Sequence, residues 1–178
     1  MVMIHDLFNA PDADVVVRSS DNVEFRLHKK NLECTTGAFP PAGTPVHTDE
    51  IVRLTESAAT LEILFQFIYP RRIPSLESLD FDSLLPLAEA AEKYEVTGSV
   101  YACEAELRKF FKTNPKQILE FSVRHNCTEL FEKIKPIMIS MDTPLSEVID
   151  ILPCNLYKPW SLLREQHLLR TAKLGLRR

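Results

Sequence analysis

The sequence predicts an α+β fold, with a small sheet in the first third of the chain and helices in the remainder. The stretch from Asp12 to Phe39 has the pattern of two strands followed by a helix, and a third strand is expected at 51–54. Beyond residue 57, apolar residues recur mostly at the spacing of amphipathic helices. The 178 residues suffice for one domain with a helical extension, and they exclude a large multidomain enzyme.

The first two strands are expected to form a hairpin. Three consecutive valines make 14–18 a β-branched run, which favours a short strand. In 23–27, apolar residues alternate with charged ones, the period of a half-buried strand. The polar residues 19–22 between the two supply turn chemistry. Three prolines and a glycine within 39–47 then predict an exposed loop.

The helices are marked by apolar periodicity and by residues that start or stop them. Ser57 is a good N-terminal cap and Pro70 a stop, and Asn114 with Pro115 predicts a sharp helix start. Leucines at 162, 169 and 176 also suit a coiled-coil seam, but two heptads are too few for one. We expect that terminal helix to pack on its neighbours or to fray. The expected helices are 28–34, 57–69, 82–95, 100–111, 115–125, 130–138, 143–149 and from Ser161 onward.

The net charge of −4 is unevenly distributed along the chain. The last fifteen residues hold five basic side chains against one acidic one, a net charge of +4, so the preceding 163 carry −8. An acidic body argues against a nucleic-acid partner. The N-terminus has no signal-peptide pattern and no later apolar run approaches membrane-spanning length, so we expect a cytoplasmic or nuclear protein without membrane attachment.

No catalytic, cofactor or metal constellation is recognisable. The four cysteines lie far apart without a CxxC pair, and the four glycines fit no phosphate-binding or nucleophile motif. His28 is interpreted as a hydrogen-bonded core residue rather than a metal ligand or a pH-sensitive group. Glu89 and Glu92 are interpreted as part of a solvated helix face. We therefore expect no enzyme and no cofactor, and an enzyme of unknown type is kept only as the least favoured alternative.

One family explains the order of these elements. The residues that carry the resemblance are Asp14, Phe25, His28, Lys29, Leu32, Thr36, Phe39, Ile51 to Leu54, Glu56, Ile68, Tyr69, Ala88, Ala91, Lys93, Tyr94 and Val96. With these residues in this order, the chain resembles a BTB/POZ domain over residues 12 to about 112. The helices after Asn114 look like the start of the BACK-type extension found after many such domains, so the whole chain is similar to small fungal-type BTB proteins.

The resemblance implies a three-stranded sheet packed on a helical cluster over 1–112, followed by a helical BACK-like extension over 113–178. It also implies a module that binds protein partners, by homodimerisation or by recruiting other chains. The alternative is a substrate adaptor that binds a cullin scaffold in a ubiquitin ligase. Fold membership does not choose between these roles.

Three departures from the family pattern bear on the mode of association. Only thirteen residues precede Asp14, which is short for the helix that many members exchange between dimer partners. Asn31 and Ala38 replace an aliphatic and an aromatic residue. Cullin-recruiting members usually have a hydrophobic residue two positions before a Glu in the loop after Phe39. This loop has Val46, His47 and Thr48 instead, which weakens the cullin hypothesis.

The residues expected at a partner-binding face come from the hairpin, Phe39 and the loop that follows. Asp14 and Lys29 match the positions of a charged pair that lies near the dimer pocket in related domains. Such a pair shapes a partner pocket or fixes the strand against the helix, and we favour the second role. The predicted contact residues are Asp14, Lys29, Phe39, Val46, His47 and Thr48.

Overall fold

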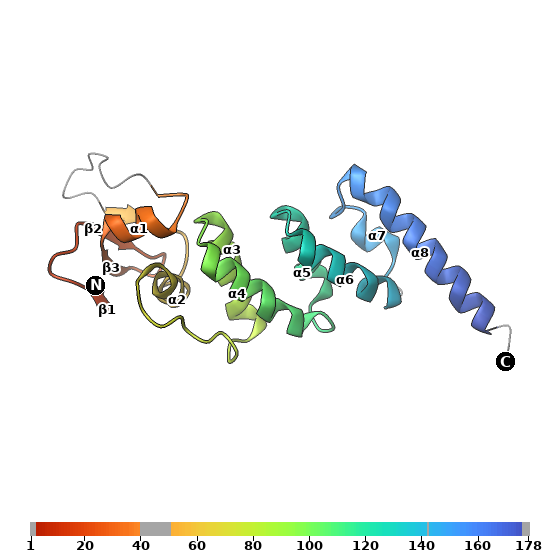
Figure 1. The fold of residues 1–178 in the computed structure, drawn as a ribbon, viewed down its shortest axis with the longest axis horizontal. Coiled ribbons are helices and arrows are strands. Elements are labelled where there is room, and N and C mark those ends of the chain that lie inside the picture. The colour runs from red at the N-terminus through yellow and green to blue at the C-terminus, as the bar shows by residue number, and fades with distance from the viewer. Residues whose placement is uncertain (1–2, 40–50, 142, 176–178) are drawn as a thin grey trace. The chain divides into compact units, whose positions relative to one another are not determined.

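The computed structural model describes residues 3–39, 51–141 and 143–175 (Figure 1). Internal contacts divide the chain into two compact units, residues 1–106 and 107–178, which we describe separately. No helix in the described part of the chain is long and apolar enough to cross a membrane.

Among its described residues, the first unit contains a four-stranded mixed sheet and four helices. The order of its strands is β1-β3-β2-β4, with β2 antiparallel to β3 and with β1 parallel to β3 and β4 parallel to β2. The α+β class is therefore confirmed, but the sheet has one strand more than the three expected. Its elements are β1 (Met3–Asn9), β2 (Val15–Arg18), β3 (Val23–Leu27), α1 (Lys29–Thr35), β4 (Ile51–Arg53), α2 (Ala58–Ile68), α3 (Phe81–Lys93) and α4 (Thr97–Leu107).

The additional strand, β1, was not predicted because its sequence shows no two-residue alternation. Phe8 is its one buried residue, and the register with β3 shifts between Ile4 and Asn9. The strand is held by side chains more than by a regular ladder. The His5 ring stacks on Phe25 with 4.6 Å between centroids, and Phe8 packs edge-on against Phe65.

The predicted hairpin of β2 and β3 is confirmed. Ser19 closes it: its backbone N–H donates to the Val23 carbonyl oxygen at 2.9 Å, and its buried hydroxyl lies 3.0 Å from the Val23 nitrogen. Asn22 has a φ of 65° at the turn, a left-handed conformation that Asn tolerates better than most residues. Val17, Phe25 and Leu27 are completely buried, so the alternation in 23–27 did identify the core face.

The turn of this hairpin also caps a helix that is distant in sequence. The Asp21 carboxylate accepts the Ala58 backbone N–H at 2.9 Å, which is the first N–H of α2. Ser57, the predicted cap, accepts the Thr60 N–H at 3.3 Å. The hydrogen bond from the Ser19 hydroxyl, together with that from Ala58, lowers the pKa of Asp21 despite its partial desolvation. Two oxygen acceptors therefore fix the start of α2.

The second unit is helical and has a core of its own. Ile118, Leu119, Leu130 and Ile134 are completely buried, and Trp160 is 2% exposed beside Phe131. The Asn114–Pro115 start is confirmed in position, although Asn114 makes no side-chain cap bond. The elements are η1 (Arg108–Phe110), α5 (Pro115–Arg124), α6 (Thr128–Ser140), α7 (Leu145–Val148) and α8 (Cys154–Gly175).

The start of α8 corrects the expectation that the last helix begins at Ser161. The helix begins at Cys154 and contains Pro159. A proline within the first two turns removes one backbone hydrogen bond and leaves the rest of the helix intact. Trp160, the next residue, anchors this part of α8 in the core. Proline usually ends a helix, whereas here the burial of Trp160 outweighs the loss of one backbone hydrogen bond at Pro159.

Candidate partner-binding face

Asp14 and Lys29 are brought together, but through a side chain and a backbone group. The Asp14 carboxylate accepts the Lys29 backbone N–H at 2.7 Å, and the Asp14 N–H donates to the Leu27 carbonyl oxygen at 3.1 Å. Lys29 is the first residue of α1. Asp14 therefore acts as the N-terminal cap of a helix that has no cap from its own N-cap residue, His28. The lysine ammonium is left for other contacts.

Phe39 lies against the C-terminal end of α3. Its ring stacks on Tyr94 with 5.2 Å between centroids and 23° between the planes. The Tyr94 hydroxyl donates to Glu56 at 2.8 Å, and the Lys93 ammonium donates to the same carboxylate at 2.8 Å. Phe39 is half-buried, so this network holds one face of its ring in place while part of the side chain stays accessible.

The network around Glu56 is electrostatically satisfied. Burial opposes ionisation of Glu56, but the hydrogen bonds from Lys93 and Tyr94 outweigh burial and lower the carboxyl pKa. Burial also raises the pKa of Tyr94 to about 12, so its hydroxyl remains a donor at neutral pH. The network therefore joins the end of β4 to α3 whenever Glu56 is ionised.

Val46, His47 and Thr48 lie outside the described residues. Their proposed role therefore rests on sequence alone.

His28 is hydrogen-bonded to Tyr69, as predicted, but it is half-buried and not a core residue. The His28 backbone N–H donates to the Tyr69 hydroxyl at 3.0 Å, and His28 Nδ1 lies 3.0 Å from the same oxygen. Nε2 lies 3.3 Å from the exposed Asp12 carboxylate. Arg71 stands over the Tyr69 ring at 5.5 Å. These contacts hold the start of α1 against the end of α2.

A shallow surface hollow of about 420 Å³ lies beside this contact. It is lined by His28, Lys30, Asn31, Tyr69, Pro70 and Arg71.

Tyr69, Glu56 and Tyr94 belong to the family pattern, but the sequence does not predict which residues they contact. Their partners are 37 to 41 residues away along the chain, so no local periodicity could reveal them. The capping role of Asp14, 15 residues from Lys29, was hidden for the same reason.

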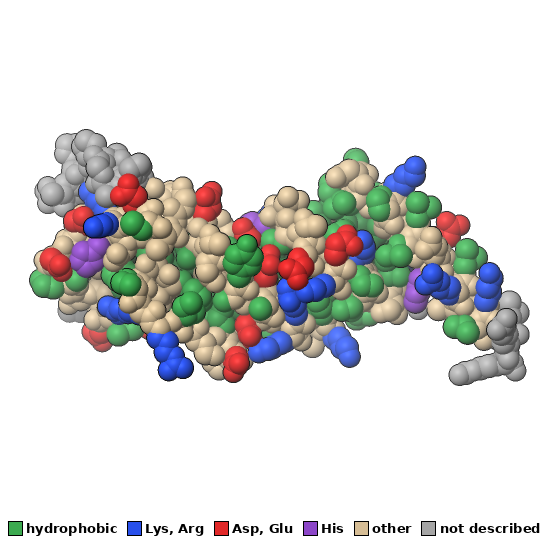
Figure 2. Space-filling model, viewed as in Figure 1, with side chains coloured by type: hydrophobic (Ala, Val, Ile, Leu, Met, Phe, Trp, Pro, Cys, Tyr) green, Lys and Arg blue, Asp and Glu red, His purple; other side chains and the backbone are tan. Residues whose placement is uncertain are grey.

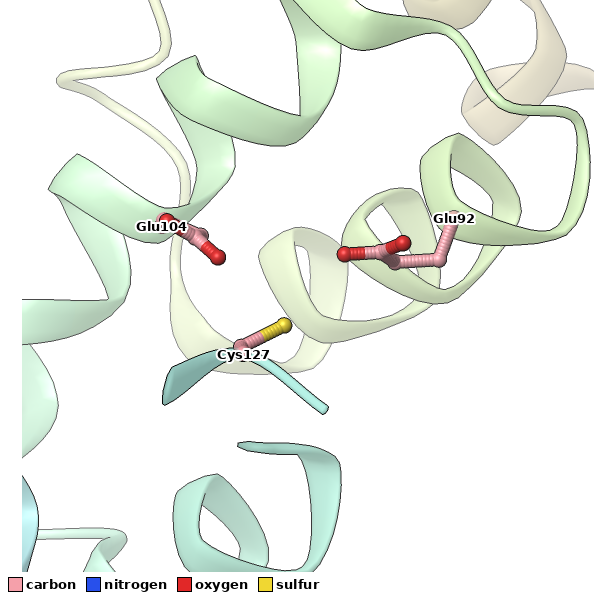
Figure 3. Close-up of side chains that lie close together, drawn as sticks. All are labelled: Glu92, Glu104 and Cys127. Atoms are coloured by element: carbon pink, nitrogen blue, oxygen red, sulfur yellow. The ribbon is translucent and has the colours of Figure 1, made fainter. Parts of the chain in front are cut away.

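Side chains that could react or bind a metal also occur away from this face. Burial raises the pKa of the Cys103 thiol to about 12, which leaves it protonated and non-nucleophilic at neutral pH. Figure 3 shows Glu92 on α3 and Glu104 on α4, together with Cys127, which precedes α6. The two half-buried glutamates belong to the first unit and the cysteine to the second. Two carboxylates in one unit do not make a coordination set, and we assign them no metal.

A comparison with protein families identifies the first unit. The model of the BTB/POZ domain matches residues 5–110, a range that contains β2, β3, β4 and most of β1, together with α1, Phe39 and the Glu56 network. No curated protein matches the chain. BTB/POZ domains are generally protein–protein interaction modules and not enzymes. Because the match covers more than half of the 178 residues, the protein belongs to the BTB/POZ domain family.

Proposed function

We propose that this protein is a non-catalytic module of the cytoplasm or nucleus that binds protein partners through the face formed by the hairpin, Phe39 and the loop after it. The observation that carries the proposal is that one interaction-domain family spans all of these segments. The four free thiols, of which Cys34 and Cys154 are exposed, are compatible with a reducing compartment.

Two contacts support this choice of face. The Asp14 cap ties α1 to the hairpin, and the Tyr94 stack holds Phe39. A surface that is fixed before binding loses less conformational freedom on association than a mobile one. Phe39 is half-buried, and aromatic rings are enriched in the cores of protein interfaces.

We further propose a division into a BTB/POZ domain over 1–112 and a BACK-like helical extension over 113–178. The family match ends at residue 110, and the compact units divide at 106/107. The helices of the second unit have a buried core of their own, including Ile118 and Trp160.

The test separates self-association from binding to another protein. Light scattering on the purified chain measures self-association, and immobilised chain measures retention of partners from the native cell. Phe39→Ala and Lys29→Glu are expected to weaken binding, whereas Lys116→Glu, an exposed charge reversal in α5, serves as the matched control. Lys29→Glu keeps the backbone N–H that Asp14 caps. A chain that stays monomeric at high micromolar concentration and retains no partner would overturn the proposal.

The second candidate is a substrate adaptor for a cullin-type ligase. It is favoured by the presence of a helical unit directly after the BTB/POZ domain. It predicts direct binding to a purified cullin that weakens when Phe39 and Val46 are replaced by alanine. Undetectable binding at micromolar cullin would eliminate this candidate and leave the broader proposal standing.

A further inference from the structure

The long helix α8 has two different sides. Its inner side carries Trp160, which is buried, and Leu163 and His167, which are half-buried. Its outer side carries Leu162, Leu168 and Leu169, which are 50%, 46% and 56% exposed in the single chain. On a helix of 100° per residue these three lie within about 120° of one another. We call them the α8 leucine face.

Basic side chains flank the α8 leucine face. Arg164 lies one turn before Leu168 and Lys173 one turn after Leu169, so the two stand on opposite sides of the leucines, while the exposed Glu165 lies within their arc, one turn before Leu169. Figure 2 shows hydrophobic and basic side chains next to one another over this helix. Exposed apolar side chains rimmed by charged ones often mark a protein-binding surface.

The two units have opposite net charges. Residues 1–106 contain 18 acidic and 8 basic side chains, a net charge of −10, whereas residues 107–178 contain 7 acidic and 13 basic ones, a net charge of +6. The basic unit of one molecule is therefore attracted to the acidic unit of another, and this attraction raises the rate of encounter. An anionic membrane, in contrast, would repel the acidic unit of the same chain.

The acidic unit has an exposed apolar strip of its own. Met3, Ile4 and Leu7 are 66%, 41% and 51% exposed on β1, and the exposed Asp6 stands between them. In the described sheet β1 is the edge strand beside β3. We call Met3, Ile4, Asp6 and Leu7 the β1 strip. It combines apolar groups with one acidic group, whereas the α8 leucine face has two basic side chains, Arg164 and Lys173, against one acidic side chain, Glu165.

We propose that the α8 leucine face of one copy docks on the β1 strip of a second copy. The two surfaces differ, so the contact is heterologous and joins the molecules head to tail. It involves neither Phe39 nor Asp14 and does not depend on the face proposed above. One helix face gives an interface at the small end of the specific range, and we expect association in the micromolar range.

Sedimentation of the full chain tests the association. The average mass is expected to rise with concentration and to fall when salt is raised from about 0.05 to about 0.5 M, because salt screens the charge attraction. Leu169→Glu and Leu7→Glu are each expected to weaken self-association at least about tenfold, since each places an unpaired charge in the apolar contact. Retained Trp160 fluorescence and circular dichroism would show that both variants fold.

A mixing experiment tests whether the contact is head to tail. The Leu169→Glu chain keeps an intact β1 strip, and the Leu7→Glu chain keeps an intact α8 leucine face. Each variant alone is therefore expected to remain monomeric, and an equimolar mixture of the two is expected to form a complex with one copy of each. If the Phe39 face also joins copies, the comparison is repeated with Phe39→Ala and Lys29→Glu in every chain, which separates the two contacts.

Matched controls are available on both surfaces. Leu174 is 67% exposed on a different side of α8, and Ile73 is 62% exposed between α2 and α3 of the first unit. Leu174→Glu and Ile73→Glu are expected to leave the mass unchanged. Three results would overturn the proposal: a mass that does not depend on concentration, self-association of Leu7→Glu alone through α8, or a monomer that binds phosphatidylserine vesicles through Leu169.

Discussion

At the scale of single residues, Asp14 is the side chain whose role is easiest to isolate. It caps α1 through the Lys29 N–H. Asp14→Ala is expected to lower the free energy of unfolding by about 0.5–2 kcal/mol, the usual cost of losing a cap, and Asp14→Asn is expected to restore most of it. Chemical denaturation measures both. The control Asp12→Ala removes an 81% exposed carboxylate and should change stability by less than about 0.5 kcal/mol.

Glu56 gives the first unit a defined dependence on acid. Its folded-state pKa lies below the ordinary value of 4.5. Its contribution to stability is therefore fully present above that value and is lost as the pH falls through the folded-state pKa. The stability difference between the native chain and Glu56→Gln is expected to be largest at neutral pH and to shrink below pH 4.5. Urea unfolding of both proteins across this range measures it, and a constant difference would contradict the assignment.

At the scale of elements, the sequence identified those whose signals are local. The alternation in 23–27, the valines before it and the Ser57 cap all predicted what the structure contains. The strand β1 was missed because the ring stacking and packing that hold it do not depend on a regular period. The start of α8 was missed because a buried tryptophan outweighs a proline.

Trp160 anchors α8 to the other helices of the second unit. Replacing this 2% exposed side chain by alanine is expected to destabilise the second unit by about 3–5 kcal/mol, through lost burial and the cavity left behind. Thermal unfolding followed by circular dichroism measures the loss. Leu162→Ala, at an exposed position of the same helix, should change stability by less than about 0.5 kcal/mol. Equal effects of the two substitutions would disprove the anchoring role.

The candidate face shows the same limit of sequence reasoning. Asp14, Lys29 and Phe39 were selected through the family pattern, and the structure adds what each one touches. We expected Asp14 to pair with the side chain of Lys29, but its carboxylate instead accepts the Lys29 backbone N–H. The reason is that the first N–H groups of a helix need acceptors. The partners of Phe39 and Glu56 could not be read from the sequence, since they depend on how β4 and α3 meet.

At the scale of the whole molecule, each of the two units has a core of its own, so we expect them to unfold separately. Trp160 is the one tryptophan of the chain and belongs to the second unit. Its fluorescence should therefore follow a different transition from far-ultraviolet circular dichroism, which reports both units. Chemical denaturation monitored by both probes measures this. Coincident transitions at every denaturant concentration would indicate a single cooperative unit instead.

The β2–β3 hairpin also bears on how the chain reaches its fold. Through Asp14 and Asp21, seven positions apart, it supplies the first acceptor to two helices that begin at Lys29 and Ala58. A slip of one residue in strand pairing would turn the valines and Phe25 to the wrong side and displace the cap acceptors. The correct register is thus stabilised by three interactions: burial in the core and the cap of each helix. We therefore expect the two caps to disfavour misregistered pairing of the hairpin as the domain folds.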